Sequence, residues 1–225
     1  MIFLALKTED GSITGKIALY CRMPGISRQG FYKYLANKDR PWKYQDLADA
    51  MSEAPLKKCV TDITEIKASD GKLYVSAIFD CFDLSVLGLA MDTNMKAELC
   101  VHTSENALNA YPDLEGAILH SDRGTQYTSD AYRKAIRDYN IRQSMNSAGG
   151  RCHDNARCES MWARMKTELL YDRYDTEEMT VEELKALIWR YFLSYWNNRR
   201  ICSSNGGLPP MIKRRQYYEA LELAA

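Results

Sequence analysis

The sequence lacks a net charge, a long apolar run and any pair of cysteines at CxxC spacing. Its 30 Lys and Arg balance 30 Asp and Glu, which weakly disfavours a protein that coats nucleic acid, although a local basic strip is still able to bind it. No segment approaches the roughly 20 apolar residues of a membrane span. The apolar start MIFLAL has no basic leader before it. We therefore expect a cytoplasmic protein with no membrane partner.

The cysteines are odd in number and scattered. Seven are present and none forms a CxxC pair, which disfavours both a disulfide framework and a zinc ribbon and favours reduced thiols in a cytosol. Cys152, His153 and Cys158 stand near one another in sequence. They lack the closer ligand pair and distant second pair of most tetrahedral zinc sites, so we do not expect metal there.

Composition and charge distribution describe a soluble globular chain with one unusual third. Hydrophobic residues make up 46% and charged residues 27% of the 225 residues, which suits one sizeable domain with small appendages. Residues 55–120 carry 5 basic and 10 acidic side chains. Such a concentration of carboxylates is either a solvated surface or a place that holds divalent metal.

The two ends of the chain are expected to be helical. In residues 1–54 a short helix, a Met-Pro-Gly turn and a second helix capped by Ser27 resemble a helix-turn-helix, and a small packing hairpin is the alternative. The segment TVEE, with apolar residues at 3–4 spacing after it, predicts an amphipathic helix over 180–197. We expect segments at 1–54, 55–175 and 176–225.

The middle of the chain shows an ordered series of strands and helices. Turn signals and apolar patterning predict strands at 57–68, 72–81, 85–92, 116–122 and 141–146, with helices at 95–111, 129–139 and from 154 through 169. The helix before the fourth strand suggests a parallel crossover. This order predicts an α/β fold with a ribonuclease-H-like, mixed five-stranded sheet flanked by helices, and with small helical extensions at both ends.

Three carboxylates stand out by their placement. Asp62 lies inside the first apolar strand, Asp122 ends the fourth strand, and Glu159 lies beside the apolar face of the long helix. In a ribonuclease-H-like sheet the first and fourth strands are neighbours and the last helix crosses beside them. The three acids would then meet, and clustered carboxylates suit Mg²⁺ or Mn²⁺. Taken alone, each acid is more often a non-catalytic residue than a catalytic one.

Residues near these acids are candidates for supporting roles. Asn155 and Lys166 lie four before and seven after Glu159, so they share its helix face. Lys166 and Arg164 either hold a DNA backbone near the metals or are surface cations.

The segment that contains Asp122 and the loop after residue 197 supply further candidates. His120 either orients ligands or fills the end of its strand, and Gln126 and Tyr127 are placed to line the site. Arg123, Arg199 and Arg200 are candidates for phosphate contact or are simply solvated. Asp80 and Asp83, after the second strand, are expected to be solvated or to cap the chain locally.

Five segments together resemble a known family. They are TDITEI, FDCFD, HSDRGTQYTS, DNARCESMWARMKTEL and YWNNRR followed by GGLPP, and they run from about Lys57 to Pro210. They resemble the integrase core of bacterial insertion-sequence transposases, the DDE-type enzymes encoded by the second reading frame of two-frame elements. HSDRGTQYTS followed by DNA and ES is a specific signature, far stronger than any single acid.

The resemblance implies a fold, a chemistry and partners. The family's catalytic and metal-binding triad falls on Asp62, Asp122 and Glu159, with Mg²⁺ or Mn²⁺, two ions in all, as the cofactor. The implied reaction is cleavage at the element's ends by water, followed by attack of the freed 3′-OH on another strand. Implied partners are DNA, further copies of the chain and the upstream-frame protein, in a nucleoid-associated setting.

One departure keeps alternatives open. The family usually has a further basic helical region between the SRQG-type start and the catalytic strand, and here Ser52-Glu53-Ala54 runs almost directly into Lys57. An active transposase catalytic subunit is the main interpretation. A truncated, inactive remnant or DNA-binding regulator is the second, and a ribonuclease-H-like nuclease with a host role is the third.

Overall fold

A computed structural model describes residues 54–145, 156–171 and 173–224. The chain divides into compact units at Met1–Ala48 and Asp49–Ala225, and the described residues belong to the second unit. The expected helix-turn-helix and the Gly-rich loop after residue 145 lie outside the described residues. The expected boundaries at 54/55 and 175/176 stay predictions.

The described elements follow the predicted order closely. They are β1 (Lys58–Ala68), β2 (Gly71–Asp80), β3 (Val86–Asp92), α4 (Ala97–Ala110), η2 (Pro112–Leu114), β4 (Ile118–Ser121), α5 (Thr125–Thr128), α6 (Asp130–Asp138), β5 (Arg142–Met145), α7 (Ala156–Met165), η4 (Lys166–Leu170), α8 (Val181–Arg190), η5 (Tyr191–Trp196), η6 (Ser203–Asn205) and α9 (Pro210–Ala224). The short helix α5 was not predicted.

The strands form one mixed sheet in the order β3-β2-β1-β4-β5. β1 pairs antiparallel with β2, and β2 with β3, which makes the expected meander. β4 lies parallel to β1 and to β5. Parallel strands need crossover connections, and here helices return the chain to the end of the sheet at which the next strand starts. The predicted five-stranded mixed sheet is confirmed.

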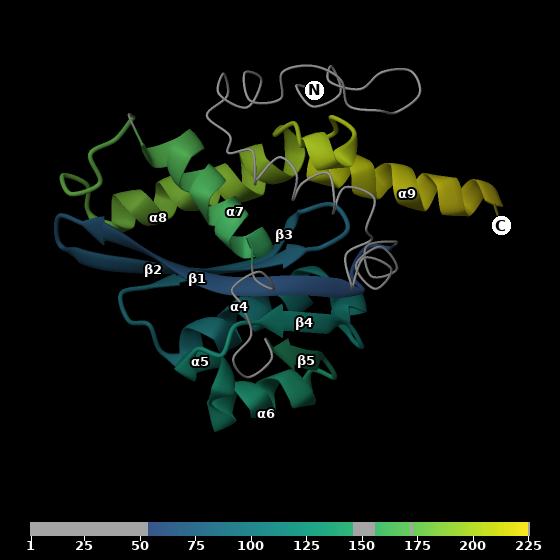
Figure 1. The fold of residues 1–225 in the computed structure, drawn as a ribbon, viewed down its shortest axis with the longest axis horizontal. Helices are drawn as coiled ribbons and strands as arrows, with labels where there is room; N and C mark the ends of the chain where they lie inside the picture. The colour runs from purple at the N-terminus through teal and green to yellow at the C-terminus, as the bar shows by residue number, and fades with distance from the viewer. Residues whose placement is uncertain (1–53, 146–155, 172, 225) are drawn as a thin grey trace, which may run out of the picture. The chain divides into compact units, whose positions relative to one another are not determined.

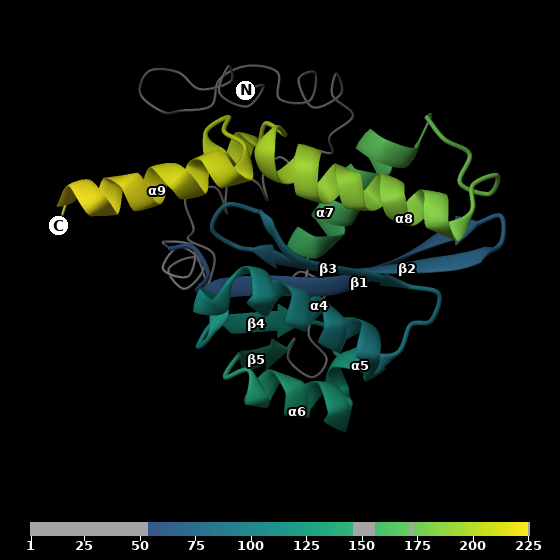
Figure 2. The same ribbon diagram turned by 180° about the vertical axis from the view of Figure 1, so that it is seen from behind.

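Helices cover both faces of the sheet. Figures 1 and 2 show α7 and α8 on one face and α4, α5 and α6 on the other. Side chains alternate along a strand, so one set of β2 residues packs under α7 and α8 while Ile78 joins the opposite core. On the first face, the Phe79 ring lies 5.5 Å from Trp162 and 6.0 Å from Phe192, centroid to centroid.

Caps begin the helices where the sequence indicated. The Ser129 side chain accepts a hydrogen bond from the Tyr132 N–H at the start of α6. Thr180 and Glu183 form both bonds of the predicted capping box before α8. Each cap satisfies N–H groups that a helix start leaves without partners.

Two helices that the periodicity predicts as continuous change to π-helix partway. α7 gives way to η4 at Lys166, and α8 gives way to η5 at Tyr191. A π-turn has i→i+5 hydrogen bonds and therefore more residues per turn than an α-helix, so positions that follow a 3–4 spacing leave the apolar face. Tyr195, expected on that face, is 43% exposed. No helix among the described residues has the length and apolar character needed to cross a membrane.

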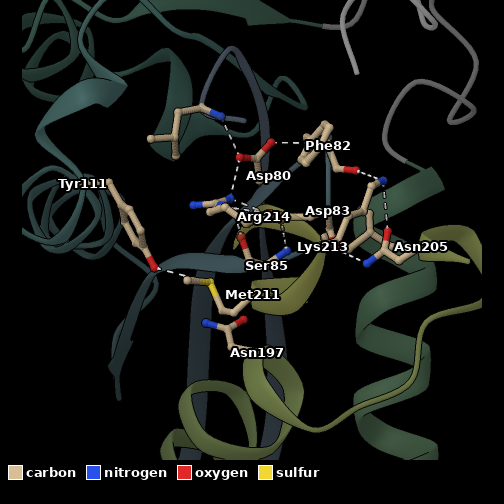
Figure 3. Close-up of polar contacts among 12 residues, drawn as sticks. Asp80, Phe82, Asp83, Ser85, Tyr111, Asn197, Asn205, Met211, Lys213 and Arg214 are labelled. Carbon is tan, nitrogen blue, oxygen red and sulfur yellow. Dashed lines mark hydrogen bonds and ion pairs between the residues drawn. The ribbon is translucent and has the colours of Figure 1, made fainter. Parts of the chain in front are cut away.

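The expectation that Asp80 and Asp83 are solvated is wrong. Both side chains are completely buried, and Arg214 of α9 binds both, through Nη2 to Asp80 and Nε to Asp83, at 2.7 Å each (Figure 3). The expected local caps are present as well, since Asp80 accepts the Phe82 N–H and Asp83 the Ser85 N–H. Their burial is explained by Arg214, a cation far away in the sequence that the local sequence pattern around the two acids does not reveal.

Candidate active site

The register between β1 and β4 brings Asp62 and Asp122 to one place. Val60 of β1 pairs with His120 of β4, and the strands run parallel. Asp62 and Asp122 each follow two residues later, just past the paired segment. Both side chains are half-buried. Parallel neighbours therefore present these two acids at the same end of the shared ladder, as the sequence predicted.

Glu159 comes from α7, on the face of the sheet opposite α4. Its side chain is exposed, whereas Trp162, one turn later, is 5% exposed and packs against Phe79. Packing of this apolar stripe fixes which side of α7 faces β1. Glu159 nevertheless lies near enough to Asp62 for its charge to act on that carboxyl.

The three acids interact electrostatically. Burial first, and then the charges of Asp122 and Glu159, raise the pKa of Asp62 to about 6. The backbone N–H of Ile63 and the indole of Trp162 partly oppose this rise. The nearby thiol of Cys158 also has its pKa raised, by burial and then by Asp62, among other charges. Mutual repulsion is the expected property of acids gathered to hold a cation.

Trp162 contributes a polar group to the same place. Its indole N–H is buried and has no hydrogen-bond partner among the described residues. It still lies near enough to Asp62 to lower the pKa of that carboxyl. A buried donor of this kind favours the ionised form of a neighbouring carboxylate. The place of Trp162 on the apolar stripe of its helix gives no sign in the sequence of this polar role.

A tight turn orients Asp122. The Gly124 N–H donates to Asp122 Oδ1 at 2.8 Å. A Cβ on Gly124 would lie 3.0 Å from that oxygen and 3.0 Å from Gln126 Oε1. A side chain at this position would therefore require the Asp122 carboxylate and the Gln126 amide to shift by a few tenths of an ångström. The Gln126 side chain donates to the Met95 carbonyl at 3.1 Å, which ties the turn to the segment before α4.

His120 and Tyr127 support the strand ends from other directions. His120 Nδ1 lies 3.0 Å from Ser144 Oγ on β5. Tyr127 is 2% exposed, and its hydroxyl lies 3.4 Å from Thr61 Oγ1, beside Asp62. Tyr127 therefore packs beneath the acids and does not line an open site, and whether His120 orients ligands stays a prediction.

The donor set fits a hard divalent cation by its chemistry. In the part of the chain that the structure describes, no three His, Cys, Asp or Glu side chains are gathered closely enough to hold an ion as they stand. The residues present are nevertheless all carboxylates, the ligands that Mg²⁺ and Mn²⁺ prefer. Their mutual repulsion, visible at Asp62, is what a bound cation would relieve.

The predicted DNA-contact cations lie in different settings. Lys166 donates a hydrogen bond to the Glu65 carbonyl at 3.3 Å. It also lines a groove of about 1000 Å³, together with residues that include Tyr171 and Arg173. Arg164 is half-buried. The exposed cations are Arg123 and Arg199. Asn155 lies outside the described residues.

Arg200 is neither solvated nor placed to meet DNA in this structure. Its guanidinium is 11% exposed and binds both carboxylate oxygens of Glu168. Sequence reasoning missed Glu168 entirely. Both residues lie inside the segments that resemble the transposase family, MKTEL and YWNNRR, and that was the one available signal.

Comparisons with known sequences find integrase-core and transposase relatives of this chain. Two models of the integrase core domain match residues 52–150 and 139–210. The chain is 37% identical over 167 residues to a probable transposase for insertion sequence element IS1353 from Shigella flexneri, covering 74% of this chain and 32% of that protein. It is 32% identical over 171 residues to a putative transposase of IS150 from Escherichia coli, covering 76% and 58%. The chain thus spans less than two thirds of these relatives.

A further relative is matched along most of its length. It is an uncharacterized transposase-like protein of Haemophilus influenzae, 37% identical over 171 residues, with 75% of each chain covered.

Solved structures share the fold. The HTLV-2 integrase catalytic core domain in complex with magnesium matches with a TM-score of 0.52 and 14% identity, covering 72% of this chain and 99% of that one. A simian T-cell lymphotropic virus intasome matches with a TM-score of 0.53 and 18% identity, covering 66% of this chain and 51% of that one. The ribonuclease-H-like fold expected from the sequence is confirmed.

Proposed function

Because the chain belongs to the integrase-core family of insertion-sequence transposases, we propose that it is a transposase catalytic subunit that cuts and joins DNA strands at the ends of an insertion sequence. The proposal is supported by the parallel pairing of β1 and β4, after which Asp62 and Asp122 follow at the same end of the ladder. It is further supported by the pKa of Asp62, which burial and then the charges of Asp122 and Glu159 raise.

The three acids are the proposed metal ligands and catalytic residues. Asp62, Asp122 and Glu159 would hold Mg²⁺ or Mn²⁺, two ions in all, and a structural relative was solved with magnesium. Bound ions of this kind activate an attacking oxygen and stabilise the leaving oxygen of a phosphodiester. The Gly124 N–H keeps Asp122 oriented, and the Trp162 N–H favours the ionised form of Asp62.

The cations around the acids are proposed to hold the DNA backbone. Lys166, two turns beyond Glu159, borders the groove and is the strongest candidate. Arg164, Arg123 and Arg199 would add contacts that position the strand without reading its sequence. Arg200 is assigned a structural role instead, because Glu168 already holds its guanidinium.

The proposed partners follow from the reaction. Two element ends must be brought together, so we propose that the chain works as a homo-oligomer on transposon-end and target DNA. The protein of the upstream reading frame is proposed to supply end recognition. A protein of zero net charge fits a catalytic part that borrows DNA affinity from elsewhere.

A strand-cleavage assay tests the proposal. Purified protein would be incubated with Mg²⁺ or Mn²⁺ and labelled DNA that carries the sequences flanking its own gene. Metal-dependent 3′-end nicking or joining is expected, with loss in Glu159→Gln and no loss in Glu98→Gln, which removes an exposed carboxylate from the first turn of α4.

Other outcomes would select the alternatives. DNA binding without products, even after the upstream-frame protein is added, would favour the inactive remnant or regulator. Cleavage of any duplex, with no preference for the flanking repeats, would favour the ribonuclease-H-like nuclease.

A further inference from the structure

A dense ionic cluster lies at η4, directly after α7, the helix that carries Glu159. Arg200 Nε donates to Glu168 Oε1 at 3.0 Å and to Oε2 at 2.9 Å, and Nη2 donates to Oε1 as well. The Tyr191 hydroxyl donates to Glu168 Oε2 at 2.8 Å. We call Glu168, Arg200 and Tyr191 the Glu168 clamp.

Further contacts hold the cation of the clamp in place. The Arg200 guanidinium lies 4.5 Å from the centroid of the Trp196 ring, and Nη1 lies 3.3 Å from Cys202 Sγ. Burial raises the pKa of Glu168, but hydrogen bonding to Arg200 and Tyr191 outweighs this effect and keeps the pKa below its ordinary value. The pair is therefore ionised and partly removed from water, with 11% of the Arg200 side chain and 31% of the Glu168 side chain exposed.

The clamp joins the two places where helices become π-helical. Glu168 is in η4, which begins at Lys166 and is closed by the Tyr171 N–H donating to the Lys166 carbonyl at 2.8 Å. Tyr191 begins η5. π-turns are rare, and they are frequently found at functional sites. Here they meet at one carboxylate, two residues from the lysine that borders the groove.

We propose that the Glu168 clamp is a positioning device that holds the π-helical turn η4 so that Lys166 extends over the groove that it lines with Tyr171 and Arg173, and contacts a DNA phosphate there. This inference rests on the proposed function. Ion pairs in protein interiors contribute little net stability, since desolvation offsets their attraction. A geometric role accounts better for four hydrogen bonds that converge on a carboxylate outside the proposed metal-binding triad. Glu168 and Arg200 are thus positioning residues that act through Lys166.

Arg200→Lys is the informative variant because it keeps the charge but loses the guanidinium fork. Binding of a fluorescently labelled duplex of arbitrary sequence would be measured by anisotropy in Mg²⁺ across a salt series. Lys166→Ala should weaken binding several-fold and reduce the slope of log K against log salt by about 0.9, the value for one phosphate contact. Arg200→Lys should produce the same two changes.

Glu168→Gln is a second variant of the clamp, and unlike Arg200→Lys it changes the net charge of the protein. It makes the protein more positive, which alone would strengthen DNA binding, so weaker binding would identify positioning. In the Lys166→Ala background neither clamp variant should weaken binding further. Asp83→Asn is the matched control, because it weakens another ion pair away from the groove and should lower the melting temperature while leaving the salt slope unchanged.

Two results would overturn the inference, and they differ. If Lys166→Ala weakens binding but the clamp variants leave the salt slope unchanged or add to the Lys166→Ala loss, the clamp is only structural and the proposed function stands. If Lys166→Ala itself changes nothing, the proposed DNA contact fails and the clamp has nothing to position.

Discussion

Replacing Arg214 with methionine should leave two carboxylates in the interior without their counter-charge. The side chain of Arg214 is 5% exposed, and those of Asp80 and Asp83 are 0% exposed. Four hydrogen bonds would be lost, two to Asp83, one to Asp80 and one to the Ser85 hydroxyl. α9 would lose its anchor on the turn between β2 and β3 (Figure 3).

The expected cost is large for a single substitution. Removing one partner of a buried ion pair costs about 3–5 kcal/mol, because the remaining charge stays desolvated. At about 2–4 °C per kcal/mol for a domain of this size, the melting temperature should fall by about 6–20 °C. Arg215→Met, an exposed neighbour on the same helix, should shift the melting temperature by no more than about 2 °C.

The cost should also depend on pH with a definite sign. Burial and the charge of Asp83 raise the pKa of Asp80 to about 6 even with Arg214 present. A folded-state pKa above the unfolded one contributes stability that is full below about pH 4 and is lost as pH rises through the folded pKa. Without Arg214 that pKa rises further, so the penalty of Arg214→Met should be larger at pH 8 than at pH 5.

Chemical denaturation at both pH values, with melting curves, measures these changes. Arg214→Met combined with Asp80→Asn and Asp83→Asn should recover part of the loss, because no buried charge then remains. A cost below about 1 kcal/mol, or one equal at the two pH values, would refute the assignment of Arg214 as the counter-ion of two buried acids.

Three further changes have definite expected outcomes. Gly124→Ala should push the Asp122 carboxylate aside and reduce metal-dependent cleavage while the protein stays folded by circular dichroism, because the new Cβ would lie 3.0 Å from Oδ1; full activity would contradict this. Glu183→Gln should lower stability near neutral pH, measured by denaturation. Its lowered pKa means that this contribution is present above about pH 4.5 and disappears as pH falls through the folded value, so wild type and variant should converge in acid. Burial raises the pKa of the thiols of Cys59, Cys100 and Cys158. In a variant that lacks the cysteines at 21 and 152, these three thiols should not react with a thiol reagent at pH 8 until the protein unfolds.

The sequence by itself determined most of the architecture. Period-two patterning located the strands, the TVEE box located the start of α8, and strand order implied that Asp62 and Asp122 meet. These features are local or follow from a known topology, since hydrophobic periodicity and caps act over a few residues. Family resemblance then singled out Glu159 among the acids of its helix.

Only the tertiary structure decided how distant polar groups pair. No local pattern shows that Arg214 neutralises Asp80 and Asp83, or that Arg200 binds Glu168 in place of solvent. The π-turns at Lys166 and Tyr191 likewise escape a 3–4 spacing rule. A charge buried in the interior must find a partner, but which partner depends on which segments the fold brings side by side.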